Sequence, residues 1–110
     1  MPRADRPELT VRVEYRTHAL WTTDGTGGVD NPDPHQLVPG ALGNELDRWA
    51  LDYDALWDDD DPRGPLFPDP SAEAAFYVRG RTLAERLADE VGGQWRVRYQ
   101  QADGSYVDLS

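Results

Sequence analysis

Residues 42–61 combine an apolar helical stripe with the densest negative charge in the chain. The apolar side chains recur mostly at steps of three and four, which is typical of one buried helix face. They are Leu42, Leu46, Trp49, Ala50, Tyr53, Leu56 and Trp57. Acidic residues fill the other faces, so we expect a helix that begins near Gly40 or Leu42, ends at Pro62, anchors the core and presents a nearly unbroken anionic surface.

Composition limits the class of protein. A chain of 110 residues is long enough for one hydrophobic core, and 38% apolar residues with four tryptophans favour folding despite a net charge of −10. The absence of cysteine excludes disulfides, thiolate metal sites and a cysteine nucleophile. No apolar run approaches membrane-spanning length, so we expect a cytoplasmic protein with a flexible leader at residues 1–7 and a single α+β domain at 8–110.

The first half of the chain predicts two strands and a long loop. Apolar and polar residues alternate from Leu9 to Arg16, which is the pattern of a half-buried strand. A second extended stretch at 19–23 carries Trp21 and would pair with the first as a hairpin. Residues 24–41 are rich in glycine, proline and aspartate, so we expect a loop there.

The second half predicts a helix followed by a hairpin. Asp69 and Pro70 are a good N-cap and first residue for a helix over 70–91, and Gly92 would cap its end. Gly80 in mid-helix suggests a close contact with a neighbouring element. Residues 95–100 alternate as a strand, and a turn with Gly104 leads into a last strand at 105–109.

These elements, in the order ββααββ, predict a two-layer α+β sandwich. We expect a four-stranded, mainly antiparallel sheet with both helices on one face. The outer sheet face would carry Arg12, Arg16, Arg96 and Arg98, opposite the acidic helix. The molecule would then be electrically two-sided.

The acidic helix and the aspartates that follow it are the candidate partner-binding site. The candidate residues are Asp47, Asp52, Asp54, Trp57, Asp58, Asp59, Asp60 and Asp61. A strong negative charge opposes binding to nucleic acid or anionic membranes and favours a basic protein partner. The alternatives are a solvated helix end without a function and, less favoured, a cation site, although the aspartate run lacks the spacing of a calcium loop.

The loop at 24–41 contains weak candidates for a metal site. Asp30, Asp33 and His35 offer carboxylates and an imidazole within a few residues, but aspartate beside glycine and proline is also ordinary turn chemistry. His18 and His35 lack a zinc-ligand spacing. With no nucleophile elbow, P-loop or dinucleotide fingerprint, the sequence favours a non-catalytic protein that needs no cofactor.

The core pattern resembles a known type of protein. Its motifs are Leu20-Trp21, then Leu46-x-x-Trp49-x-x-x-Tyr53-x-x-Leu56, then Phe76-x-x-x-Gly80-x-x-Leu83-Ala84-x-x-Leu87, and a last strand with Val97 and Tyr99. Together they are similar to small acidic uncharacterised actinobacterial proteins, some of immunity-protein type. Immunity proteins neutralise a toxin by covering its basic active site. The resemblance covers about residues 20–99 and implies a fold but no functional residue.

The leading hypothesis is therefore a protein-binding module, an immunity or inhibitor protein that docks on a basic toxin or enzyme through its acidic first helix. The alternative is a domain that binds a small ligand or a divalent cation with the 24–35 loop. The chain would act as a monomer or as a homodimer that pairs its acidic helix with the arginines of the sheet.

Overall fold

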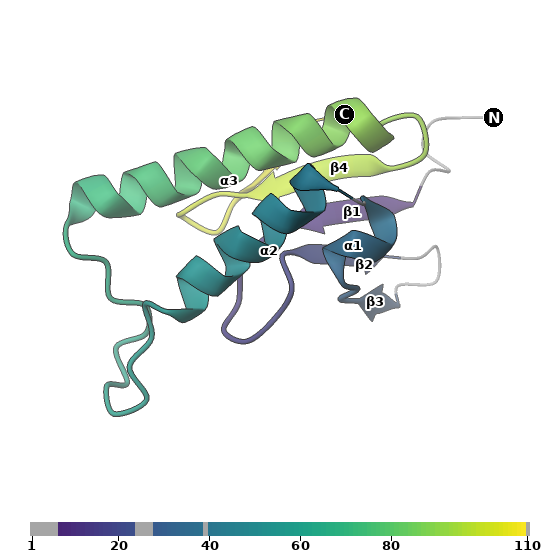
Figure 1. The fold of residues 1–110 in the computed structure, drawn as a ribbon. Coiled ribbons are helices and arrows are strands. Elements are labelled where there is room, and N and C mark those ends of the chain that lie inside the picture. Colours follow the sequence, from purple (N-terminus) through teal and green to yellow (C-terminus); the bar gives the residue numbers. More distant parts are fainter. Residues whose placement is uncertain (1–6, 24–27, 39, 110) are drawn as a thin grey trace.

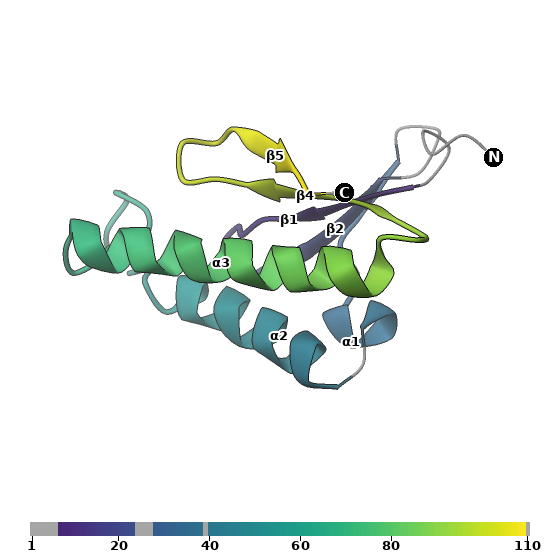
Figure 2. The same cartoon turned by 90° about the horizontal axis from the view of Figure 1, so that it is seen from above.

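The computed structural model describes residues 7–23, 28–38 and 40–109. Within these residues the chain forms two layers, a sheet and a set of helices that cover one of its faces (Figures 1 and 2). The elements in chain order are β1 (Glu8–Val11), β2 (Leu20–Thr23), β3 (Val29–Asp30), α1 (Pro34–Leu37), α2 (Ala41–Asp54), α3 (Pro70–Val91), β4 (Arg96–Gln100) and β5 (Tyr106–Asp108). The α+β class and the placement of the helices on one face are as predicted.

The sheet differs from the prediction in strand number and direction. Its order is β3-β2-β1-β4-β5, with β1 antiparallel to β2 and parallel to β4. The expected four-stranded, mainly antiparallel sheet is thus a five-stranded mixed sheet. Parallel neighbours require a long crossover connection, which the segment containing all three helices supplies. β1 lies at the centre, where Leu9 is opposite Thr22 on one side and Val97 on the other.

The first strand is shorter than predicted. β1 ends at Val11, although the alternation continues to Arg16. The hairpin with β2 requires the chain to reverse, and it does so with Arg16 in the left-handed region at φ 61° and a hydrogen bond from Thr17 N to Glu14 O. Tyr15 consequently leaves the sheet and becomes available to a distant loop.

The region expected to be a loop contains two short elements. β3 pairs with β2, and α1 begins with Pro34 after Asp33, whose carboxylate accepts a hydrogen bond from the backbone N–H of His35 at 3.0 Å. Aspartate followed by proline is a helix-start signal that the surrounding turn residues obscured. The leader residues 1–6, Asp24 and Pro39 lie outside the described residues.

The acidic helix ends earlier than predicted. α2 stops at Asp54, eight residues before Pro62, so the aspartates at 58–61 lie in the loop that joins α2 to α3. Asp58 and Asp61 accept hydrogen bonds from the backbone N–H groups of Asp60 and Arg63, at 2.9 Å each. Such local bonds compete with helix formation. These charges therefore do not lie at the negative end of the α2 dipole, where they would be unfavourable.

The helix predicted over residues 70–91 has the expected bounds at both ends. α3 spans Pro70–Val91, Asp69 caps it by accepting from the backbone N–H of Ala72 at 2.8 Å, and Gly92 is the C-cap. Gly80 faces Trp49 of α2 and Tyr99 of β4, so the predicted close contact is confirmed. The indole N–H of Trp49 donates to the carbonyl oxygen of Phe76, which joins α2 to α3 inside the core.

The helices and the sheet enclose one cluster of buried apolar side chains. The largest of the fully buried side chains among the described residues are Trp49, Tyr99, Leu9, Leu20, Leu46, Leu87, Val11, Val97 and Pro34. The C-terminal hairpin forms as predicted, with Gly104 at φ 88° in its turn. No helix in the described ranges is long and apolar enough to cross a membrane.

Candidate partner-binding surface

One edge of α2 carries carboxylates on either side of an exposed leucine. Asp47, Leu51 and Asp54 follow at steps of four and three and therefore share one helix face. They line a groove of about 330 Å³ between α2 and the turn at 16–18. Leu51 is 62% exposed, an unusual position for a leucine on a helix that packs on the core. Carboxylates beside an accessible apolar side chain can form ion pairs and an apolar contact with a basic protein surface.

The loop after α2 continues this edge. Arg16 connects the two, because its backbone N–H donates to Asp54 Oδ1 at 2.8 Å and its guanidinium lies 3.9 Å from Asp59 Oδ2. The Tyr15 hydroxyl donates to Asp59 Oδ1 at 2.8 Å. We call Asp47, Leu51, Asp54, Asp58, Asp59 and Asp60 the acidic edge. In Figure 1 the loop projects beyond both the helices and the sheet.

Trp57 anchors the loop to the body of the protein. Its ring stacks on Tyr15 with centroids 4.8 Å apart, and a Cβ at Gly64, which has φ 89°, would lie 3.5 Å from the same ring. The buried indole N–H makes no hydrogen bond of standard geometry with the described residues. Burial raises the pKa of the neighbouring Tyr53 phenol, and the interaction with Trp57 opposes part of that rise. Trp57 is half-buried, so only part of its ring is available to a partner.

Several of the predicted acidic residues already have arginine partners. Asp52 pairs with Arg79 at 2.7 Å, and Asp61 pairs with Arg63 at 2.6 Å. The Arg63 guanidinium and its backbone N–H hold the pKa of Asp61 below its usual value. Asp58 and Asp60, by contrast, are exposed and make no ion pair within the part of the chain that the structure describes.

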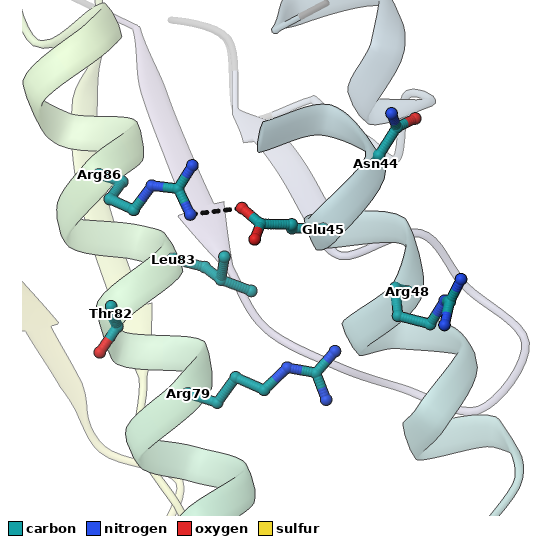
Figure 3. Close-up of a pocket in the computed structure, with 7 residues that line it drawn as sticks. All are labelled: Asn44, Glu45, Arg48, Arg79, Thr82, Leu83 and Arg86. Carbon is teal, nitrogen blue, oxygen red and sulfur yellow. Dashed lines mark hydrogen bonds and ion pairs between the residues drawn. The ribbon is translucent and has the colours of Figure 1, made fainter. Parts of the chain in front are cut away.

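The predicted separation of charge is wrong. Arginines extend from α3 toward the acids of α2 and line a groove of about 530 Å³ together with Arg48 (Figure 3). Arg86 forms an ion pair with Glu45 across this groove. On the sheet side, Arg12, Arg96 and Arg98 pair with Glu14, Asp108 and Glu8. Positive and negative groups are interleaved, so the continuous anionic surface expected over the whole first helix is absent, and the remaining negative groups of α2 lie along the acidic edge.

The two histidines meet at the start of the acidic edge. His18 Nδ1 lies 3.7 Å from Asp47 Oδ1, and His35 Nε2 lies 3.1 Å from Asp47 Oδ2. Asp33 joins this group, whereas the exposed Asp30 accepts a hydrogen bond from the backbone N–H of Asn31. No local spacing marks His18 as a member of this cluster, because its partners Asp33 and Asp47 lie 15 and 29 residues away along the chain.

Comparison with known proteins agrees with the resemblance to immunity proteins. A search of curated proteins finds no match. Residues 7–102 match the family model described as Serratia CdiI immunity protein-like, a span that includes the whole core and the acidic edge. An actinobacterial origin stays a prediction. Because the match covers most of its length, the chain belongs to the Serratia CdiI immunity protein-like family.

Proposed function

We propose that this protein is a non-catalytic immunity protein that binds a basic toxin through its acidic edge. Membership of an immunity-protein family supports binding to a toxin. The observation that carries the choice of surface is that Asp58 and Asp60 are exposed and have no ion-pair partner among the described residues. The loop that holds them is joined through Arg16 to the groove that the 62% exposed Leu51 lines. Cytoplasmic action and a one-to-one complex belong to the same proposal.

The charge arrangement favours fast association. Asp58 and Asp60 lie on a projecting loop, where a basic toxin surface meets them before other contacts form. Long-range attraction of this kind raises the association rate more than it slows dissociation, and salt screens it. The pairs Asp52 with Arg79 and Asp61 with Arg63 are already neutralised, so we expect both to contribute less than Asp58 and Asp60.

The test is the association rate with the cognate toxin domain, for which the neighbouring genes are the first source to examine. The double variant Asp58→Asn/Asp60→Asn removes two charges and keeps an oxygen that accepts the bond from the backbone of residue 60. We expect it to slow association at low salt by about tenfold, within the range that electrostatic steering spans. The difference should shrink as salt is raised, as followed by stopped-flow fluorescence.

The matched control is Asp89→Asn/Glu90→Gln, which removes the same charge from exposed positions at the end of α3. This control should associate almost as fast as the wild type. Equal slowing of both double variants would mean that only net charge matters, and an unchanged rate for Asp58→Asn/Asp60→Asn would contradict the proposed surface.

A further inference from the structure

Three separate elements place possible metal ligands at one point. His18 precedes β2, Asp33 caps α1 and Asp47 lies in the middle of α2. One ligand atom from each lies within 4.8 Å of the other two. The two carboxylates repel each other at this separation, and a bound divalent cation would remove the repulsion.

The Asn31 side chain holds the backbone of this site in place. Its Oδ1 accepts from the backbone N–H of His18 at 2.9 Å, and its Nδ2 donates to the carbonyl oxygens of His18 and Leu20 at 2.9 and 2.7 Å. These three bonds join segments 11 to 13 residues apart. Asp33 follows Asn31 by only two residues. The hydrogen bonds between the Asn31 side chain and the backbone of His18 and Leu20 therefore also fix the position of Asp33 relative to His18.

Gly43 allows α1 to approach α2 on the other side of the site. A Cβ at position 43 would overlap the carbonyl oxygen of Val38 and lie 3.1 Å from His35 Nδ1. The close approach brings His35 Nε2 to 3.1 Å from Asp47 Oδ2. The two oxygens of Asp47 therefore have different neighbours: Oδ1 faces His18, and Oδ2 is oriented by His35. Such an outer partner is typical of carboxylates that bind metals.

We propose that His18, Asp33 and Asp47 bind a divalent transition-metal ion of the Zn²⁺ type, with His35 as a positioning residue for Asp47. One imidazole and two carboxylates suit Zn²⁺ better than Mg²⁺ or Ca²⁺, which prefer oxygen ligands alone. Three protein ligands leave a fourth position for water or for another ligand. The side chains of His18 and Asp47 are 44% and 32% exposed, so an ion reaches them directly and they rotate to close around it.

The site shares Asp47 with the acidic edge but not Asp58 or Asp60, the residues varied in the toxin experiment, and it is tested on the purified chain alone. Titration calorimetry with ZnCl₂ should show one site, with much weaker binding of MgCl₂. Each of His18→Asn, Asp33→Asn and Asp47→Asn should weaken Zn²⁺ binding at least tenfold. Asparagine at position 33 can still cap α1, so this variant separates ligand loss from loss of the helix. His35→Gln should weaken binding by about 10–100-fold without abolishing it.

Three further measurements test whether the ion binds at this site and whether the variants are folded. Co²⁺ should produce visible absorption bands in the wild type that His18→Asn abolishes, which a purely structural role for the histidine would not explain. The melting temperature of the wild type should rise with Zn²⁺ concentration, because an ion that binds only the folded state stabilises it. Circular dichroism without metal should show that each variant is folded.

The control variant is Asp58→Asn/Asp60→Asn, which should bind Zn²⁺ as the wild type does. Absence of heat with Zn²⁺, or binding that His18→Asn and Asp33→Asn leave unchanged, would overturn the proposed site. Loss of binding in the control would place the ion on the loop and would equally overturn it. None of these outcomes bears on the toxin experiment.

Discussion

The indole ring of Trp49 occupies the space that a side chain at position 80 would need. A Cβ built on Gly80 would overlap the ring and would lie 2.6 Å from the hydroxyl oxygen of Tyr99. Trp49 is fully buried, stacks on Phe76 with centroids 5.0 Å apart and donates to a backbone carbonyl of α3. The missing side chain therefore sets the distance between the two long helices.

We expect Gly80→Ala to destabilise the protein. Alanine improves helix propensity by up to about 1 kcal/mol, but overpacking a rigid core costs about 1–3 kcal/mol or more. The Cβ of alanine would meet the buried ring of Trp49, which a hydrogen bond holds in place. The net loss in the free energy of unfolding should therefore be about 2 kcal/mol. Urea denaturation measures it. Gly93→Ala, where a Cβ meets nothing within 4 Å, is the control and should cause no comparable loss.

Leu51→Ala should weaken toxin binding and leave stability unchanged. Leu51 is 62% exposed, so its truncation should alter the free energy of unfolding by no more than about 0.5 kcal/mol. As an apolar anchor inside the acidic edge it should contribute at least about 1 kcal/mol to binding. Calorimetry with the toxin domain measures the effect. Val78→Ala, at a 66% exposed position on α3, should change neither quantity, and equal weakening by both variants would contradict the assignment.

Stability should fall in alkaline solution because of buried phenols. Burial raises the pKa of Tyr99 far above its usual value, and its hydroxyl donates to the carbonyl oxygen of Tyr77 at 2.7 Å. Burial also raises the pKa values of Tyr53 and Tyr77. Above the ordinary tyrosine pKa of about 10, the unfolded chain releases protons that the folded chain retains. The free energy of unfolding is therefore fully maintained below this pH and should decline above it.

The slope of the free energy of unfolding against pH shows whether Tyr99 is responsible for this decline. A tyrosine that stays protonated in the folded chain, as Tyr99 does, should lower the free energy of unfolding by about 1.4 kcal/mol per pH unit above pH 10. Tyr99→Phe should reduce this slope by the contribution of one proton. The variant should also have a free energy of unfolding about 1–3 kcal/mol lower at neutral pH, because the Tyr77 carbonyl loses its hydrogen-bond donor. Denaturation curves across the alkaline range provide both numbers. An identical slope in wild type and Tyr99→Phe would show that Tyr99 does not titrate as its burial implies.

Tyr15→Ala should loosen the loop that carries the aspartates at 58–61. The change removes the stack on Trp57 and the hydrogen bond to Asp59, which together are worth about 2 kcal/mol. Trypsin cleavage after Arg63, an exposed residue of this loop, should then accelerate by about tenfold or more, because cleavage follows the population of the opened loop.

Mass spectrometry of the cleavage products follows the bond after Arg63. Tyr106→Ala is the control, since Tyr106 lies in the edge strand β5, where its exposed ring packs on Arg98 of β4 and makes no ring contact with the loop among the described residues. If both variants are cleaved after Arg63 at the wild-type rate, Tyr15 does not hold the loop.

Local signals in the sequence were sufficient for much of the fold. The Asp69 cap, Pro70 and the apolar periodicity predicted α3 with its observed bounds, because these interactions lie within a few residues of each other. The alternation around Val97 and Tyr99 predicted β4, and Gly80 indicated a close contact. The family resemblance rested on the same core positions.

The candidate sites were less predictable. Continuous acidic and apolar periodicity suggested a helix that ends only at Pro62, yet the chain leaves the helix after Asp54 and folds back to Tyr15, more than 40 residues earlier. Periodicity shows which residues are suited to a helix. It does not show which distant side chains form contacts with those residues that end the helix.

The sequence by itself determined the strongly acidic composition, the apolar faces and the capped helix, because each depends on neighbours along the chain. The tertiary structure alone decided that β1 and β4 run parallel, that Arg79 and Arg86 neutralise acids of α2, and that His18 and His35 share Asp47. These outcomes join residues between 12 and about 90 positions apart. Their energies depend on the packing of whole elements, which no local pattern records.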